Sequence, residues 1–419
     1  MKRREFIRNG LSFVALGAAM PTVLMQAAQA DESSTGKGQS AASATPAGKI
    51  LVVIELQGGN DGLNTVIPYQ DGNYSKMRPG IGIAARDVEP ISAQLGLHPR
   101  LKPLKSLFEA GHLAVINGVG YPKPNRSHFE SMDIWQTGNP TLDVAHRKGW
   151  LARYFDADGH LVNDPISGLC VGGSLPLAFS SDNSSASVFS DGNNSFGIGN
   201  DDDRRMQDAA MHELYAQGTV AGSGAEFVHK VGNDVFSSTQ EFRRALTTYD
   251  TKAGKRANYP QNNGFAPSMQ TVAKLITGGL KTRVYYVSLG GFDTHANQPY
   301  NHANLMGVLA ETISAFYEDL TLQGRDKDVA VMTFSEFGRR AKENASSGTD
   351  HGAASVMFVA GGSVQGGIYG DYPSLTDLDD GDLKFHTDFR RVYATLLDKW
   401  VGSSSQNVLG GQFEPLKFL

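Results

Sequence analysis

Residues 49–64, KILVVIELQGGNDGLN, decide the fold. The run at 49–56 is continuously apolar and rich in β-branched residues, which is typical of a strand buried on both faces. Such strands belong to parallel sheets that are covered by helices on both sides. The glycines around Asn60 and Asp61 end the strand in a tight turn. We therefore expect a parallel α/β core in which Asp61 follows the first strand.

The same alternation of short buried strands and amphipathic helices continues along the chain. Further strands are predicted at 112–118, 282–289, 328–334 and 354–362, and helices at 101–111, 127–138, 305–320 and 388–402. This order favours an α/β fold with a doubly wound, mostly parallel sheet flanked by helices. The polar, glycine-rich range 139–265, with helical pieces at 203–218 and 238–250, predicts an inserted cap subdomain.

The first thirty residues predict an export signal. Arg3 and Arg4 precede an apolar run at 11–24 and a small-residue ending at Ala28-Gln29-Ala30, a pattern that resembles a twin-arginine signal peptide. The apolar run is shorter than the roughly 20 residues of a membrane-spanning helix. We expect the twin-arginine export machinery as a partner and a periplasmic or secreted mature protein, with a flexible linker at 31–48, a domain at 49–402 and a C-terminal tail at 403–419.

Charge and cysteine content exclude some partners. The chain of 419 residues has a net charge of -5. Residues 1–30 hold four basic residues and Glu5, so the mature chain would carry -8. An acidic surface argues against nucleic acid or an anionic membrane as the main partner. Cys170 is the single cysteine, so no intramolecular disulfide can form.

Potential metal ligands adjoin four of the predicted strands. They are Asp61 after 49–56, Asp293 and His295 after 282–289, Glu336 after 328–334, and Asp350 and His351 before 354–362. Loops at the carboxyl ends of parallel strands converge on one crevice. Mixed oxygen and imidazole ligands suit zinc or manganese. The pattern predicts a divalent metal site with one or two ions.

Each of these residues also has a simpler interpretation. Asp61 can be a turn residue, Asp293 can cap the following helix, and Glu336 can pair with Arg339 or Arg340. Asp350 can orient His351 rather than touch a metal. Their joint position at strand ends is what favours the metal site.

Ser127 is the candidate nucleophile. In one interpretation it belongs to a capping box with Glu130, in which the two side chains satisfy backbone amides at the start of the helix. In the other, a metal-activated Ser127 attacks an anionic ester bound at the helix N-terminus. The two roles are compatible. Arg126 or Arg339 would then neutralise the charge of the ester.

Several motifs together resemble a known family. GGNDGLN, SHFES, GGFDTH, SEFGR, GTDHG and the late DFRRVY resemble exported bacterial proteins with domain of unknown function 1501, of the alkaline phosphatase and sulfatase superfamily. The resemblance extends over 49–402. It implies an alkaline phosphatase-like α/β core, one or two metals, and hydrolysis of phosphate or sulfate esters.

The resemblance also assigns roles to residues. It implies that Asp61, Asp293, His295 and His351 are metal ligands and that Ser127 lies near the nucleophile. Two departures affect the second metal: the central pair is Asp-x-His, and Glu336-Phe337 stands where the superfamily usually has Asp-His. The leading hypothesis is an exported metal-dependent hydrolase acting on a small anionic ester. The alternatives are a non-catalytic exported binding protein and a structural assembly protein.

Overall fold

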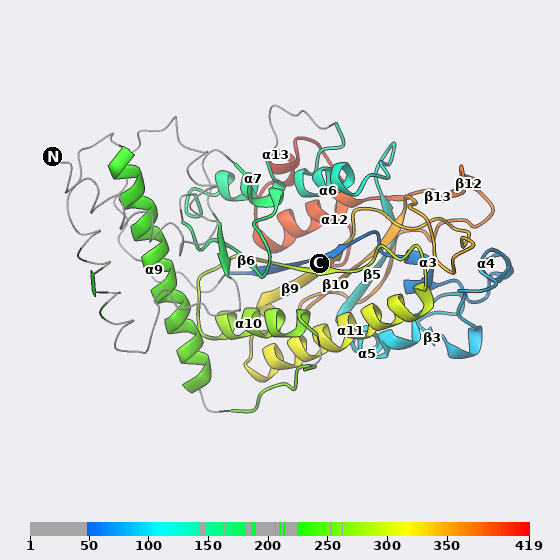
Figure 1. The fold of residues 1–419 in the computed structure, drawn as a ribbon, viewed down its shortest axis with the longest axis horizontal. Coiled ribbons are helices and arrows are strands. Elements are labelled where there is room, and N and C mark those ends of the chain that lie inside the picture. Colours follow the sequence, from blue (N-terminus) through cyan, green and yellow to red (C-terminus); the bar gives the residue numbers. More distant parts are fainter. Residues whose placement is uncertain are drawn as a thin grey trace. The chain divides into compact units, whose positions relative to one another are not determined.

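A nine-stranded sheet forms the centre of the described part of the chain (Figure 1). The computed structural model describes residues 48–141, 148–162, 164–181, 186–189, 224–251, 254–261 and 263–419, and isolated positions between 206 and 213. The strand order is β11-β5-β10-β9-β1-β8-β6-β7, and β14 also pairs with β5. The strands are β1 (Ile50–Gln57), β5 (Leu113–Gly120), β6 (Gly168–Val171), β7 (Ser187–Phe189), β8 (Val284–Gly290), β9 (Val329–Phe334), β10 (Ser355–Ala360), β11 (Gly367–Tyr369) and β14 (Thr387–Asp388).

The first predicted strand, β1, lies in the middle of this sheet. It pairs in parallel with β8 on one side, where Leu51 is opposite Val284, and with β9 on the other, where Ile50 is opposite Val329. Among the described strands of this sheet only β10 is antiparallel to its neighbours β9 and β5. The prediction of a mostly parallel α/β sheet is confirmed.

Helices cover both faces of the sheet, as expected for a doubly wound fold (Figure 1). Ile50, Val52 and Ile54 of β1 pack with α5 (Lys102–Glu109), α10 (Phe265–Thr277) and α11 (Gln298–Leu322) on one face. The alternate residues Leu51 and Val53 pack with the second helical layer on the other face. That layer consists of α6 (His128–Thr137), α7 (Trp150–Ala157), α12 (Phe389–Thr395) and α13 (Ser405–Leu409). Because side chains alternate along a strand, β1 has to be apolar throughout.

The helices predicted at 127–138 and 388–402 form with closely similar bounds. Gly138 ends α6 with a φ of 65°, the left-handed conformation that glycine adopts easily. The predicted helix at 388–402 begins at Phe389, but its second half, Leu396–Val401, is π-helical. The apolar stripe of α11 is confirmed, with Leu309, Ile313, Phe316 and Leu320 buried in the core.

Part of the predicted insert contributes to the sheet. Strands β6 and β7 lie within 139–265 and extend the sheet beyond β8. The chain divides into two units, one of Met1–Ala42 and Ser195–Thr239, the other of Ser43–Asn194 and Gln240–Leu419. In the first unit the described structure is mainly the beginning of α9 (Gly224–Thr251). The helical piece predicted at 203–218 lies largely outside the described residues, as do the signal peptide and linker.

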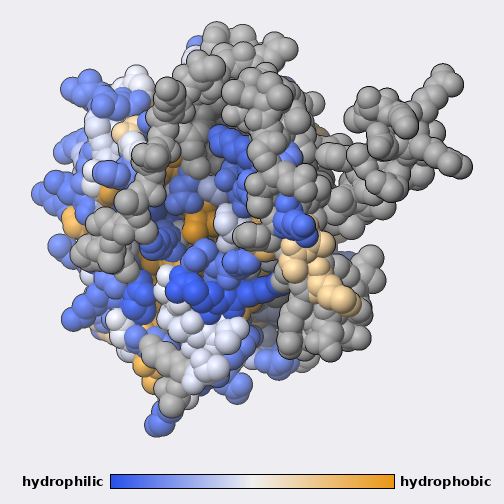
Figure 2. Space-filling view, turned by 90° about the vertical axis from the view of Figure 1, so that its left-hand side faces the viewer, coloured by the Kyte–Doolittle hydropathy of each residue, from blue (hydrophilic) through white to orange (hydrophobic). Residues whose placement is uncertain are grey.

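One face of the described structure is largely polar. Hydrophilic residues predominate among the coloured residues of the face in Figure 2. The search for helices long and apolar enough to cross a membrane found none among the described residues.

Candidate metal site

Two imidazoles and a carboxylate meet at the carboxyl edge of the sheet. His128 is the first residue of α6, Asp293 follows β8, and His351 precedes β10. One ligand atom from each of the three lies within 4.8 Å of the others. β10 runs antiparallel to β9, so the residue before β10 reaches the same edge as the residues that follow the parallel strands. We call these three residues the His-Asp cluster.

Hydrogen bonds fix the orientation of both imidazoles. Nδ1 of His351 lies 2.8 Å from the carbonyl oxygen of Arg126. A carbonyl only accepts, so this nitrogen carries a proton. Nδ1 of His128 lies 2.7 Å from Oε1 of Glu336. The Nε2 atoms of both rings face Asp293, at 3.5 Å from Oδ2 for His128 and 3.3 Å from Oδ1 for His351.

Glu336 holds His128 of the His-Asp cluster in place from a buried position. Its carboxylate is buried, and Oε1 also accepts a hydrogen bond of 2.9 Å from the backbone amide of Gly58. The hydrogen bond from His128 to Glu336 raises the pKa of His128, which makes the ring a stronger base and a better metal ligand. Phe337 packs against both imidazoles, with ring centroids 4.9 Å from His128 and 4.8 Å from His351. Glu336 thus orients His128, whereas the sequence predicted that Glu336 itself would bind a metal.

Asp293 receives several donors. Arg339 Nη2 lies 2.6 Å and His295 Nδ1 2.8 Å from Oδ1. Partial burial raises the pKa of Asp293, but the hydrogen bond and charge of Arg339, together with His295, outweigh that effect and lower it. The carboxylate is therefore ionised at neutral pH. His295 adjoins the cluster through this contact and through its ring, 4.8 Å from that of His351.

The buried Arg339 ties together three loops that carry the cluster. Its guanidinium donates to the carbonyls of Gly59 at 2.7 Å, Thr349 at 2.9 Å and Phe292 at 3.0 Å, and also to that of Gly58. With Asp293 as a further acceptor, all three nitrogens of the guanidinium bond to protein oxygens. Arg339 is placed to hold the site together, and these contacts leave it little capacity to bind an ester.

Gly58 explains one of the glycines after β1. Its φ is 118°, and a Cβ at this position would lie only 2.4 Å from the backbone nitrogen of Asp293. Real Cβ atoms do not approach so closely, so only glycine lets the two strand exits come together here. The motif GGNDG is therefore needed for close packing next to Asp293.

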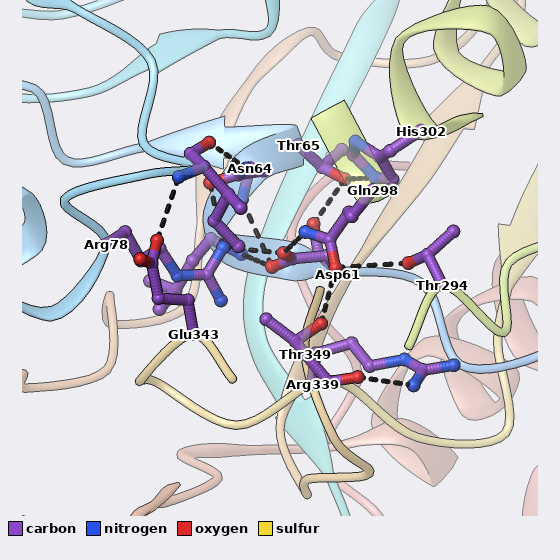
Figure 3. Close-up of polar contacts among 12 residues, drawn as sticks. Asp61, Asn64, Thr65, Arg78, Thr294, Gln298, His302, Arg339, Glu343 and Thr349 are labelled. Carbon is purple, nitrogen blue, oxygen red and sulfur yellow. Dashed lines mark hydrogen bonds and ion pairs between the residues drawn. The ribbon is translucent and has the colours of Figure 1, made fainter. Parts of the chain in front are cut away.

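Asp61 is held by protein donors rather than by the His-Asp cluster (Figure 3). Its side chain is fully buried, with Oδ2 2.5 Å from Arg78 Nη1 and also hydrogen-bonded to Gln298. Oδ1 caps α3 (Gly62–Thr65) through the amides of Leu63 and Asn64 at 3.1 and 3.2 Å. Burial raises the pKa of Asp61, but the charge and hydrogen bond of Arg78 outweigh this effect, so the pKa lies below its usual value. Arg78 supplies the positive charge that a metal would supply to a ligand.

The network around Asp61 connects the segment after β1, the start of α11 and the loop before His351 (Figure 3). Gln298, the first residue of α11, accepts hydrogen bonds from Thr294 at 3.1 Å and from Thr349 at 2.6 Å. His302 contacts Asn60 at 3.0 Å on the other side. Asp61 thereby fixes β1, α11 and the loop before His351 relative to one another.

The capping box predicted at Ser127 is wrong. Ser127 occupies the N-cap position of α6, but within the described structure its side chain makes no capping hydrogen bond. Glu130 instead accepts a hydrogen bond of 2.5 Å from the side-chain nitrogen Nδ2 of Asn125. Asn125 takes over part of the cap, because its side-chain oxygen accepts from the amide of Ser127 at 2.7 Å. The hydroxyl of Ser127 is thus available for another role, one residue before His128.

The remaining predicted residues lie around the cluster. Arg126 contributes its carbonyl to His351, while its guanidinium pairs with Asp382 at 2.8 Å. Asp350 is exposed and bonds to Asn344 at 3.1 Å, in the loop that leads to His351.

His128 is the residue that sequence reasoning missed. It stands beside Ser127 in the segment after the strand at 112–118, the position that predicted ligands elsewhere. The pattern Ser-x-x-Glu predicted helix capping for this segment. His128 follows a predicted strand, as most of the other candidate ligands do, and this position is the signal that identifies it.

Comparisons with solved structures gave distant similarities. A Vibrio parahaemolyticus protein in the alkaline phosphatase superfamily is 10% identical, with a TM-score of 0.38, over 88% of this chain and 70% of that one. The C-terminal periplasmic domain of EcEptC from Escherichia coli is 10% identical, with a TM-score of 0.39, over 89% of both chains. The lipoteichoic acid synthase LtaP from Listeria monocytogenes is 9% identical, with a TM-score of 0.38, over 87% of this chain and 75% of that one.

Comparison with curated proteins gave no match. The family model described as a protein of unknown function (DUF1501) matches residues 113–409. This range includes His128, Asp293, Glu336 and His351, and it covers most of the chain. The chain therefore belongs to the DUF1501 family.

Proposed function

We propose that this protein is an exported metal-dependent hydrolase of phosphate or sulfate esters. The observation that carries the proposal is the arrangement of His128 and His351, whose Nδ1 atoms are both engaged while both Nε2 atoms face Asp293. Metal-binding histidines usually have such a partner on the nitrogen that does not bind the metal. Nε2 of His128 is buried and has no hydrogen-bond partner among the described residues, a cost that a bound cation would remove.

The donor set suits zinc or manganese. His128, Asp293 and His351 would provide three ligands, and three protein ligands with an open position are typical of catalytic zinc sites. His295 would be a fourth candidate ligand, since its Nδ1 atom contacts Asp293. We leave Asp61 and Glu336 out of the ligand set, because their oxygens are occupied by protein donors. We therefore propose a site for one metal ion.

When bound, the metal would supply positive charge to the ester oxygens and lower the pKa of a coordinated hydroxyl. Ser127 is our candidate nucleophile, since it precedes His128 and its side chain makes no cap bond in the described structure. It stands at the N-terminus of α6, where the helix dipole favours an anionic group. Arg126, which adjoins Ser127, is our candidate cation for the ester, although Asp382 offsets part of its charge.

Metal analysis of the purified mature protein tests the first half of the proposal. We expect about one equivalent of zinc or manganese, and its loss in His128→Ala and His351→Ala. His160→Ala is the matched control, because His160 is exposed and outside the cluster. A wild-type protein that binds neither metal after dialysis against each would refute the site.

Hydrolysis of chromogenic phosphate and sulfate esters tests the second half. We expect turnover that chelation abolishes and that the bound metal restores. A protein that binds metal but hydrolyses none of these esters would be a binding protein with a structural metal. The contacts of Arg339, which engage its donors with protein, are the observation that favours this second function.

Export by the twin-arginine machinery remains part of the proposal. It rests on the paired Arg3 and Arg4 and on the short apolar run that follows them. Replacing both arginines with lysine should leave the protein in the cytoplasm, as fractionation and immunoblotting would show. Unchanged export of the double variant would contradict this route.

A further inference from the structure

A second feature adjoins the proposed metal site. A pocket of about 740 Å³ is lined by the segment that leads into α6, including Pro124 and Arg126, and by the segment around Asp382 and Phe385. Its wall is continuous with the cluster, because the carbonyl of Arg126 binds His351 and Ala353 also lines the pocket. The volume falls within the range of small-molecule sites, roughly 300–1,000 Å³.

A tight hairpin places Asp382 in this pocket. Strands β12 (Leu378–Asp379) and β13 (Asp382–Leu383) are joined by two residues only, Asp380 and Gly381. Their φ values are 50° and 84°, the positive values of a type I′ turn. Such a turn fixes the register, so the position of Asp382 is determined by the backbone.

Asp382 has one oxygen that lacks a donor. Its side chain is only 3% exposed, and Oδ2 accepts a hydrogen bond of 2.8 Å from Arg126 Nε. Oδ1 is buried and has no hydrogen-bond partner among the described residues; Arg340 Nε lies 3.6 Å away. Burial raises the pKa of Asp382, although Arg126 opposes this. An unsatisfied buried acceptor costs about 1–3 kcal/mol, which a donor from a ligand would recover.

The rest of the lining restricts the kind of donor. The charges of the lining largely offset one another. Lys123, Arg126 and Lys384 line the pocket together with Asp379 and Asp382. Arg126 pairs with Asp382, and Lys384 pairs with Asp377, so the lining favours a neutral ligand over an ionic one. Pro124 and the half-buried Phe385 offer an apolar surface next to the carboxylate. A neutral ligand with hydroxyl donors and an aliphatic face matches both features. Sugars have this chemistry, since their hydroxyls donate and their C–H faces pack on aromatic rings.

We propose that this pocket binds a sugar, which is the alcohol part of the ester that the metal site would hydrolyse. Oδ1 of Asp382 accepts a sugar hydroxyl, and Phe385 packs against the ring. Bound in this way, the sugar extends from the pocket toward His351. The inference deepens the proposed function and rests on it for the role of the sugar as part of a substrate. The binding of the sugar itself needs no metal.

Calorimetric titration of the purified mature protein with free sugars tests the proposal. The probes are glucose, galactose, mannose, N-acetylglucosamine and glucuronate, each titrated with and without a chelator. We expect at least one to bind, and Asp382→Asn and Phe385→Leu each to weaken it at least tenfold. Asp371→Asn is the matched control, an exposed aspartate of the same region that does not line the pocket. Circular dichroism establishes that each variant is folded.

The outcomes separate the pocket from the metal site. No binding of any of the five sugars by the wild-type protein overturns the proposal, and so does equal binding by wild type and Asp382→Asn. Sugar binding that persists in His128→Ala supports the pocket, even if that variant and the wild type hydrolyse no ester. In that case the proposed hydrolysis fails while the sugar pocket stands.

Discussion

Nδ1 of His128 lies 2.7 Å from Oε1 of Glu336, and this contact joins the first residue of α6 to the exit of β9. A helix and a strand that are distant in sequence thereby hold one imidazole in a single orientation.

Replacing Glu336 with glutamine should weaken metal binding about 10–100-fold, because the carboxylate that orients His128 is lost while the shape is kept. Competition with a fluorescent zinc chelator would measure the change. Glu109→Gln is the control, since Glu109 is exposed at the end of α5. Unchanged affinity in Glu336→Gln would show that Glu336 does not support the ligand.

Ser127→Ala separates the two roles predicted for this serine. A capping serine contributes typically about 1 kcal/mol, but the hydroxyl makes no capping bond in the described structure. We therefore expect a change in unfolding free energy below about 0.5 kcal/mol, together with a loss of ester hydrolysis of at least 100-fold. Urea unfolding and steady-state kinetics provide the two values. A clear loss of stability with normal kcat would restore the capping interpretation.

Asp61→Asn should destabilise the fold without altering the metal content of the folded protein. The change leaves the buried Arg78 without its counter-charge, which costs about 3–5 kcal/mol in comparable buried pairs. Urea unfolding would measure the loss, and metal analysis of the remaining folded protein would give the stoichiometry. Loss of metal from a folded Asp61→Asn protein would instead place Asp61 among the ligands.

Arg339→Lys should lower the free energy of unfolding by at least about 3 kcal/mol, because a lysine cannot replace the several buried hydrogen bonds of the guanidinium. The carbonyls of Gly59, Phe292 and Thr349 would lose their donor. Arg340→Lys is the control, since Arg340 is partly exposed and pairs with Asp380 at 3.4 Å. Similar losses in both variants would argue against a special role for Arg339.

Acid should destabilise the protein through His98 and His302. Burial lowers the pKa of His98 from 6.5 to about 3 and that of His302 from 6.5 to about 4. Below pH 6.5 these two histidines are protonated in the unfolded chain but stay neutral in the native state. The free energy of unfolding is therefore highest above this pH and falls toward pH 4. The slope is at most about 1.4 kcal/mol per pH unit for each histidine.

His98→Asn isolates one of these two groups. Nδ1 of His98 accepts a hydrogen bond from the amide of Arg100 at 3.0 Å, a cap that asparagine can also form. Urea unfolding at several pH values should show a shallower decline for His98→Asn between about pH 6.5 and 5. Equal slopes for the variant and the wild type would contradict the assignment.

The strands could be predicted because burial leaves a strong trace in the sequence. The apolar run of β1 forms both faces of the core, and the direction of the parallel strands then brings Asp293 and His351 to one edge. The position of a side chain at this edge did not predict which residues it would contact. Asp61 stands at the expected strand exit, yet Arg78, seventeen residues later, binds its carboxylate.

Local patterns failed where tertiary contacts compete with them. The Ser-x-x-Glu pattern predicted a capping box, but Asn125 donates to Glu130 and accepts from the backbone amide of Ser127 instead. At Glu336 the structure shows a partner that position in the sequence does not predict: Nδ1 of His128, whose Nε2 faces Asp293. Such second contacts depend on side-chain directions that no short motif encodes.

The central position of β1 has a consequence for synthesis of the protein. Its partners Val284 and Val329 lie far along the chain from Leu51 and Ile50, so this apolar strand leaves the ribosome long before either neighbour exists. Non-local pairing of this kind folds slowly and leaves hydrophobic segments open to aggregation in the meantime. The segment KILVVIEL therefore stays without its strand partners until β8 and β9 have been synthesised.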